Sequence, residues 1–184
     1  MSNPIHTLKH EHRVIELGLR ALNGICLRLG SNQAVPPAAL IQVHDFIRAF
    51  TDRYHHWKEE LYFFPALERK GIRRQGGPLG ALVHQHEVER ELVAELYRAI
   101  SGYTAGDAES VRRFVNAARR YIELLTCHME REDQILFRLA EELFDEADKV
   151  ELDRAFKRAE AIVGQCVLET FEQVARELEK TWAV

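Results

Sequence analysis

Apolar residues recur along almost the whole chain at the spacing of one helix face. Near the amino terminus, for example, they fall one or two helical turns apart at Ile5, Leu8, Ile15, Leu19 and Leu22. Such spacing predicts amphipathic α-helices. Alternation of apolar and polar residues, which would predict β-strands, occurs in no segment of the sequence. The pattern therefore predicts an all-α protein.

Capping residues, prolines and glycines mark the ends of the predicted helices. Asn3 and Pro4 are typical of a helix start, and Gly30 is typical of an end. A second helix is predicted to begin at Pro37 and to end before Gly71, which suits a left-handed C-cap. The predicted long helices span roughly residues 4–29, 37–70, 78–101 and 107–144.

Four long helices joined by short loops pack most simply as an up-down-up-down four-helix bundle. We therefore expect residues 1–144 to form one such bundle. Residues 145–184 are expected to add one or two helices, broken near Gly164, that pack on the same domain as a C-terminal extension.

The sequence contains an internal repeat that relates the first predicted hairpin to the second. Residues 55–64 align with residues 128–137, because both segments carry a histidine, a basic residue, a glutamate and a late phenylalanine in the same order. Residues 8–14 align in the same way with residues 82–88. Two related hairpins predict a bundle with approximate two-fold symmetry, which is suited to placing two metal ions about one axis.

The repeated segments carry histidines and glutamates that point at one level of the core. Residues i and i+4 share a helix face, so His55 with Glu59, and His128 with Glu132, each direct an imidazole and a carboxylate to the same space. His12 and His86 interrupt otherwise apolar stripes at the same level. Buried carboxylates need compensation, and bound metal explains this set of groups best. The proposed ligands are His12, His55, Glu59, His86, His128 and Glu132.

Six protein ligands for two ions leave room for an oxo or hydroxo bridge and for an open position. Imidazoles and carboxylates without thiolates suit iron, manganese or zinc. Two carboxylates also suit a dinuclear site, because they can bridge both ions and offset part of the charge. An open position would admit a small ligand such as oxygen, nitric oxide or peroxide.

Other histidines compete for the same role. Neighbouring residues on a helix point about 100° apart, so His55 and His56 are not expected to face one centre together. The pair His56 and Glu60 would align with Met129 and Asp133, which is not a ligand pair, and His55 with Glu59 is therefore preferred. His10 and His84 are predicted to be surface residues or outer partners of the ligands. His6 and His44 are predicted to be surface residues.

Composition supports a soluble metal protein of one domain. The 184 residues include 46% hydrophobic and 29% charged residues, with a net charge of -4. The absence of basic blocks argues against a nucleic-acid or membrane binder. No signal pattern and no apolar run of roughly 18 to 20 residues is present, so we expect a cytoplasmic protein. Cys26, Cys127 and Cys166 lack the spacing of a thiolate zinc site and are expected to be small buried residues.

These motifs, taken in order, resemble those of the hemerythrin-like, HHE cation-binding family between Ile5 and Phe144. The matching elements are E-H-x-x-I at His12, H-H-x-K-E-E at His55, H-E at His86 and H-x-x-x-E at His128. The resemblance implies a four-helix bundle with a non-haem di-iron centre, held by the six residues proposed above. Members of this family include oxygen carriers, oxygen and redox sensors, and proteins linked to nitric-oxide stress and iron-sulfur repair.

The chain departs from the oxygen carriers of that family at two positions. The carriers have a further histidine four residues after the histidine of the third helix, where this chain has Arg90. They also ligate through an aspartate five residues after the last histidine, which here is Asp133, although the repeat favours Glu132. We expect Arg90 to be a cation near the ligands, paired with Glu16, or to form a salt bridge at the end of the bundle. Glu16 is also a candidate ligand.

The departure at Arg90 favours a di-iron protein that binds or senses oxygen, nitric oxide or redox state over a dedicated oxygen carrier. The alternative is a di-iron enzyme acting on peroxide or nitric oxide, or an iron donor in iron-sulfur cluster repair. A third possibility is a metal-dependent interaction protein, either a homodimer or the binder of another protein. Its contacts would come from the C-terminal helices around Phe171 and Trp182, although these aromatic residues are more typical of core packing.

Overall fold

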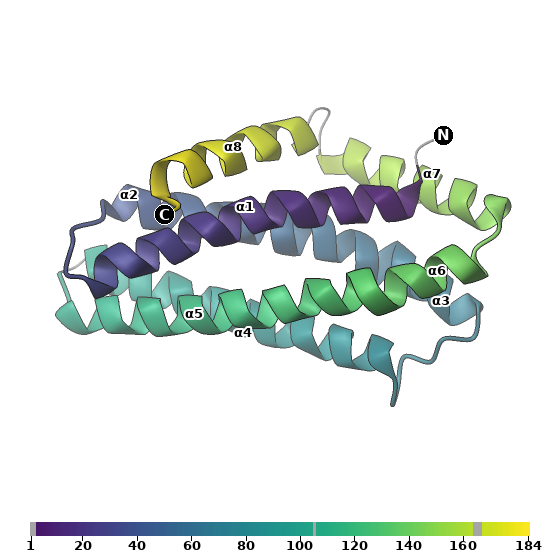
Figure 1. Ribbon diagram of the computed structural model, residues 1–184, viewed down its shortest axis with the longest axis horizontal. Coiled ribbons are helices and arrows are strands. Elements are labelled where there is room, and N and C mark those ends of the chain that lie inside the picture. The colour runs from purple at the N-terminus through teal and green to yellow at the C-terminus, as the bar shows by residue number, and fades with distance from the viewer. Residues whose placement is uncertain (1–2, 105, 164–166) are drawn as a thin grey trace.

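The computed structural model describes residues 3–104, 106–163 and 167–184, and within these ranges all regular structure is helical (Figure 1). This confirms the predicted all-α class. The first half of the chain forms α1 (Pro4–Gly30), α2 (Pro37–Phe46), η1 (Ile47–His56), η2 (Glu59–Phe63) and α3 (Phe64–Arg69). The second half forms α4 (Pro78–Thr104), α5 (Ala108–Arg131), η3 (Glu132–Leu136), α6 (Phe137–Leu143), α7 (Glu146–Val163) and α8 (Val167–Trp182).

Four helical rods correspond to the four predicted long helices. α1 and α4 are each one rod, α2 continues through η1 and η2 into α3, and α5 continues through η3 into α6. In Figure 1 the rods lie along the long axis of the molecule, and α4 and α5 are neighbours. α1 packs against α5, and α2 packs against α4. The arrangement is a helical bundle.

The predicted caps explain where α1 begins and where the second rod ends. The Asn3 side chain accepts a hydrogen bond of 3.0 Å from the Ile5 backbone N–H, as expected of an N-cap. Gly71 has a φ of 93°, the left-handed conformation that a glycine C-cap supplies. Gly30 is the last residue of α1, but the left-handed residue that turns the chain is Asn32, with a φ of 57°.

Both copies of the repeated motif contain a wider, π-helical turn that begins at the glutamate of the motif. η2 begins at Glu59, and η3 begins at Glu132. Such turns are frequent at functional sites. Pro65 is not their cause, because the second copy has Arg138 at the equivalent position and contains the same turn. The turns therefore belong to the repeat itself, and helical spacing alone did not predict them.

The apolar core consists of two clusters separated by a polar layer. On α1, Leu8 belongs to one cluster and Ile15 to the other, and His12 lies between them. The same division recurs on the other three rods, each of which contributes buried residues to both clusters. The helices thus place their histidines and glutamates at one level of the bundle, between two apolar regions that exclude water.

The C-terminal helices lie beside α1 (Figure 1). Phe156 of α7 is buried in one core cluster, and Phe171 and Trp182 of α8 pack against the other. The end of α8 approaches α1 closely at Gly24, where a Cβ atom would lie 1.8 Å from the backbone oxygen of Trp182. Phe171 and Trp182 thus pack against the core, which the sequence analysis gave as the more typical role of such aromatic residues.

The cysteines match the sequence expectation only in part. Cys26 is buried, but Cys127 is exposed, because it lies on the outward face of α5. Cys166 and the break predicted near Gly164 fall in residues 164–166, outside the described ranges. Within those ranges, no helix combines the length and the apolar character needed to cross a membrane.

Candidate metal centre

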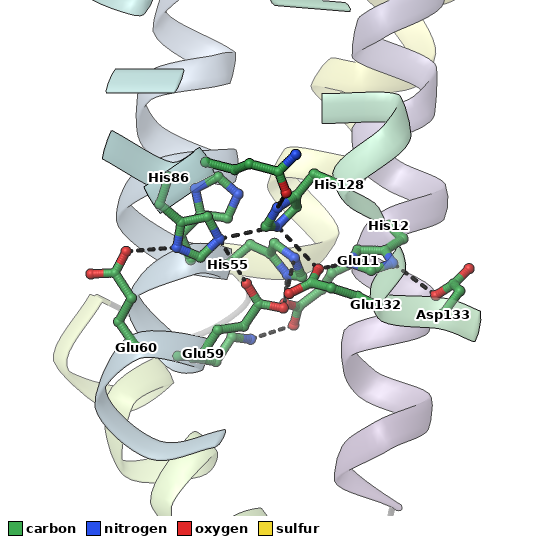
Figure 2. Close-up of polar contacts among 12 residues, drawn as sticks. Glu11, His12, His55, Glu59, Glu60, His86, His128, Glu132 and Asp133 are labelled. Atoms are coloured by element: carbon green, nitrogen blue, oxygen red, sulfur yellow. Dashed lines mark hydrogen bonds and ion pairs between the residues drawn. The ribbon is translucent and has the colours of Figure 1, made fainter. Parts of the chain in front are cut away.

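The structure brings all six proposed ligands together in the polar layer. Figure 2 shows the carboxylates of Glu59 and Glu132 at the centre, with His86 on one side and His12 on the other. None of the six side chains has any solvent exposure; they are His12, His55, Glu59, His86, His128 and Glu132. The His/Glu pairs chosen on the second and fourth rods therefore do share one space.

The ligand atoms form two groups that share Glu59. One, the His12 group, consists of His12, His55, Glu59 and Glu132. The other, the His86 group, consists of His56, Glu59, His86 and His128. Within each group the candidate ligand atoms lie within 4.8 Å of one another. Two clusters of this size, with a common carboxylate, match the dimensions of a dinuclear site.

Each central glutamate faces a histidine from both groups. The Oε1 atom of Glu59 lies 3.4 Å from His55 Nε2, and its Oε2 atom lies 3.5 Å from His86 Nε2. The Oε2 atom of Glu132 lies 3.3 Å from His12 Nε2 and 3.2 Å from His128 Nε2. Each carboxylate thus lies between a histidine of one group and a histidine of the other.

His56 is a candidate ligand that the sequence analysis rejected. Its side chain is only 1% exposed, and its ring stacks on that of His86 with centroids 3.9 Å apart. His55 and His56 were not expected to face one centre together, but both lie in the polar layer. The repeat gave no signal for His56, because its equivalent is Met129. The side chain of His56 lies against α4, where it contacts His86 and Glu89.

The other histidines lie away from the centre. His6, His10 and His84 are exposed, as expected. His44 was expected to be a surface residue but is 5% exposed, because its ring packs against Tyr97 with centroids 5.6 Å apart. Only the five buried histidines of the polar layer therefore belong to the candidate site.

Each of the four predicted ligand histidines uses its Nδ1 atom for an outer contact. The contacts are His12 to Asp133 at 2.9 Å, His55 to Glu11 at 2.9 Å, His86 to Glu60 at 2.7 Å and His128 to Gln85 at 3.3 Å. In a neutral ring that donates from Nδ1 to its outer oxygen, the Nε2 atom is left with a lone pair directed at the centre. The Nε2 atoms of His86 and His128 lie 3.0 Å apart, so without metal one of them holds a proton between the two rings. Glu11 and Gln85 are equivalent in the repeat, and so are Glu60 and Asp133. The repeat therefore includes the residues that contact the ligands as well as the ligands themselves.

Several buried polar atoms of the centre have no hydrogen-bond partner in the protein. They include Nε2 of His12 and His55, both ring nitrogens of His56, and both carboxylate oxygens of Glu59 and Glu132. A buried polar atom without a partner destabilises a protein by about 1–3 kcal/mol, and more if it is charged. Bound cations would satisfy these atoms together. The residues present therefore fit a metal centre.

Electrostatics lead to the same conclusion. Burial and the negative charge of Glu132 raise the pKa of Glu59 well above its usual value, so the two carboxylates need cations in order to ionise together. Burial lowers the pKa of His55 to about 4. Burial also lowers the pKa of His86. These two imidazoles are neutral at neutral pH, as metal ligands must be. For His12 and His128, neighbouring carboxylates outweigh burial and raise the pKa, so a metal ion would have to displace a proton there.

Arg90 lies outside the centre, in contact with an acceptor of a ligand histidine. It donates to Glu60 at 2.5 Å and to Asp52 at 2.7 Å. Glu16 is not its partner, because Glu16 pairs with Arg13 at the surface, and this exposure also excludes Glu16 as a ligand. Both expectations for Glu16 were wrong, because α4 packs against the second rod, from which Arg90 takes both of its partners.

Glu89 is a further buried carboxylate beside the centre, and the sequence analysis missed it. It is 2% exposed, its oxygens have no hydrogen-bond partner, and Oε2 lies 3.5 Å from His56 Nε2. Burial raises its pKa to about 7. Its equivalent in the repeat is the apolar Ile15, so the symmetry of the repeat gave no signal for it. Together, His56 and Glu89 make the His86 group richer in polar atoms than the His12 group.

Comparison with known proteins agrees with this site. Uncharacterized proteins of Mycobacterium tuberculosis and Mycobacterium bovis are each 29% identical to the chain over 130 residues, which is 71% of the chain and 50% of each relative. The chain thus spans about half the length of these curated relatives. No solved structure matches the chain significantly. The family model of the hemerythrin HHE cation binding domain matches residues 3–140. The chain belongs to the hemerythrin HHE cation-binding family.

Proposed function

We propose that this protein is a non-haem di-iron protein that binds or senses oxygen, nitric oxide or redox state at an open coordination position. The observation that carries the proposal is the pair of buried ligand groups that share Glu59. Residues 1–144 would form the up-down-up-down four-helix domain that holds the iron, and residues 145–184 would be an extension packed on it.

The six predicted ligands, with His56 added, would hold the two ions. Glu59 and Glu132 would bridge them, and an oxo or hydroxo group would complete the bridge. The donor atoms accept iron, manganese or zinc. We propose iron because the motifs resemble those of the family's di-iron members. A bound iron pair would supply redox chemistry and a position for a small ligand, while the surrounding apolar clusters keep water away.

The two ions would differ in the number of imidazoles that surround them. The His86 group contains three imidazoles, whereas the His12 group contains two, His12 and His55. The open position is therefore proposed at the ion of the His12 group. This differs from the sequence interpretation, in which Arg90 left a ligand position open on the third helix, because His56 now contributes an imidazole on that side.

A second candidate function is an enzyme that acts on peroxide or nitric oxide. The observation that favours it is Glu89, a buried carboxylate with no hydrogen-bond partner beside His56. A carboxyl group whose pKa is raised to about 7 by burial can hold or release a proton near neutral pH. Proton transfer of this kind is needed in turnover but not in simple binding.

Metal analysis combined with absorption spectroscopy tests both candidates. The protein is loaded with Fe²⁺ without oxygen, its iron content is measured, and spectra are recorded before and after addition of oxygen, nitric oxide or peroxide. Two irons per chain and a spectral change with one of these molecules are expected. A chain that binds no iron would refute both functions. Catalytic turnover that disappears in Glu89→Gln, with the iron content retained, would favour the enzyme, whereas stoichiometric binding alone would favour the binding protein or sensor.

A further inference from the structure

A buried lysine lies directly behind the metal centre. Lys58 is 1% exposed, and its ammonium group donates to Glu11 and, at 3.2 Å, to Glu160. The same group lies 3.8 Å from the centre of the Tyr54 ring. A charge removed from water must be paired to be tolerated, and here two carboxylates and an aromatic face compensate it. The position of this ammonium group is therefore well defined.

Glu11 connects the lysine to a ligand of the His12 group. Its Oε2 atom accepts the hydrogen bond from His55 Nδ1 at 2.9 Å, and its other oxygen accepts from Lys58. His55 thus donates to a carboxylate that also accepts from a buried ammonium group. A carboxylate in this place fixes the ring and makes the imidazole a stronger electron donor.

The other half of the repeat lacks this arrangement. The equivalent of Glu11 is Gln85, a neutral amide that lies 3.3 Å from His128 Nδ1. The equivalent of Lys58 is Arg131, which is exposed. The two halves of the centre therefore differ in charge around otherwise equivalent histidines, and the charged arrangement belongs to the half proposed to have the open position.

The charged arrangement reaches into the C-terminal extension. Glu160 is a residue of α7, which lies beyond the part of the chain that the family model matches. Its Oε1 atom accepts from the ammonium group of Lys58 and, at 3.1 Å, from the hydroxyl group of Tyr54. A continuous series of contacts therefore runs from α7 through Lys58 and Glu11 to the ligand His55.

We propose that Glu160 is a positioning residue of the metal centre, which acts through Lys58 and Glu11 to fix the orientation and donor strength of His55. The inference rests on the proposed function, since it requires an ion in the His12 group. It makes α7 a part of the centre, and it assigns to the extension an effect on one ion of the pair and not on the other.

The test is a titration of the purified full chain with Co²⁺, followed by visible absorption. Three proteins are compared: the wild type, Glu160→Gln, and the control Glu151→Gln, which changes a glutamate of the same helix that pairs at the surface with Arg69. We expect the wild type to bind two ions. Glu160→Gln should weaken the binding of one ion by roughly two- to tenfold. This is less than the roughly 10- to 100-fold effect of an outer partner that contacts a ligand directly, because Glu160 acts through Lys58 and Glu11. Glu151→Gln should bind both ions as the wild type does.

A second background separates positioning from general loosening of α7. In Glu11→Gln the series of contacts is already broken, so adding Glu160→Gln should change Co²⁺ binding no further. The positioning role would be overturned if Glu160→Gln weakened the binding of both ions equally. It would also be overturned if Glu160→Gln lowered Co²⁺ affinity in the Glu11→Gln background as much as it does in the wild type. So would a wild type that binds two ions and a Glu160→Gln protein that matches the control. A wild type that does not bind two ions would refute the proposed function, and the inference with it.

Discussion

The imidazole of His56 stacks on that of His86, with ring planes 16° apart. The two residues come from different rods, and the contact brings His56 into the His86 group. The oxygen carriers that the motifs resemble take a third histidine from the third helix, where this chain has Arg90. Here the second rod can supply that imidazole instead, so the arginine does not by itself indicate a missing ligand.

Replacing His56 by alanine is expected to weaken binding of one ion and to spare the other. A direct ligand should contribute more than the outer partners, whose loss typically weakens metal binding about 10- to 100-fold. The measurement is a Co²⁺ titration of His56→Ala, with His84→Ala as the control because His84 is exposed. If His56→Ala bound both ions with wild-type affinity, His56 would be a packing residue only.

Glu59→Gln should have opposite effects on stability with and without metal. Glu59 belongs to both ligand groups, so the variant should lose both ions and the stability that they supply. In a chelator, removal of one of two adjacent buried carboxylates should stabilise the fold by about 1 kcal/mol, which corresponds to about 2–4 °C in melting temperature. Thermal melting with Co²⁺ and with EDTA checks both signs. A lower melting temperature in EDTA as well would argue against the repulsion between Glu59 and Glu132.

Metal affinity is expected to rise with pH up to about pH 9, well above the ordinary histidine range. Burial lowers the pKa of His12, but the hydrogen bond with Asp133 and the adjacent carboxylate of Glu132 outweigh burial and raise it to about 9. Below that pH a metal ion must displace a proton, which gives a slope of about tenfold per pH unit. Glu59, whose pKa burial also raises, adds a slope of the same sign. His55, with a pKa of about 4, adds none near neutral pH.

Co²⁺ titrations at several pH values between 6.5 and 9 test this expectation. Asp133→Asn weakens the hydrogen bond that holds the proton on His12. In this variant the rise of Co²⁺ affinity with pH should therefore level off at a lower pH than in the wild type. The stability of the metal-free protein in EDTA should instead fall as the pH rises. The stabilisation that comes from protonated His12 is complete below its unfolded pKa of about 6.5 and is lost as the pH rises through 9. An affinity that stays constant over this range would contradict the raised pKa.

The sequence located the residues that lie on the inner stripe of each helix, because helical spacing and the repeat both report that stripe. His12 and Glu132 were found in this way. His56 and Glu89 were missed because each replaces an apolar equivalent, so they lie where the repeat is asymmetric. Their approach to the centre depends on how the rods pack and on the π-helical turns, neither of which is encoded in apolar spacing. The contacts of Glu11 with His55 and Lys58 were also missed, because they depend on how the first and second rods pack.

The packing of α8 on α1 predicts a large effect of one added methyl group. In Gly24→Ala the new Cβ atom would meet the backbone of Trp182 at 1.8 Å, so the end of α8 must move. Overpacking of this kind destabilises proteins by about 1–3 kcal/mol. Gly30→Ala is the matched control, because no atom lies within 4 Å of its added Cβ. Thermal melting should separate the two variants, and equal melting temperatures would show that α8 does not contribute to stability.

The asymmetry of the centre suggests a substitution that would block the open position. Met129 is 5% exposed and is the equivalent of His56 in the repeat. Met129→His would offer a third imidazole to the His12 group, where the open position is proposed. The iron content should then stay at two per chain, while the spectral change with nitric oxide or azide should be reduced.

Stability distinguishes a new ligand from a histidine that is merely buried. A buried imidazole without a partner is unfavourable, so in EDTA Met129→His should melt at a lower temperature than the control Met129→Leu. If the new imidazole binds the ion, iron should remove most of that difference, because the metal satisfies the nitrogen atom. A difference that persists with iron, together with an unchanged response to nitric oxide, would place the open position elsewhere than in the His12 group.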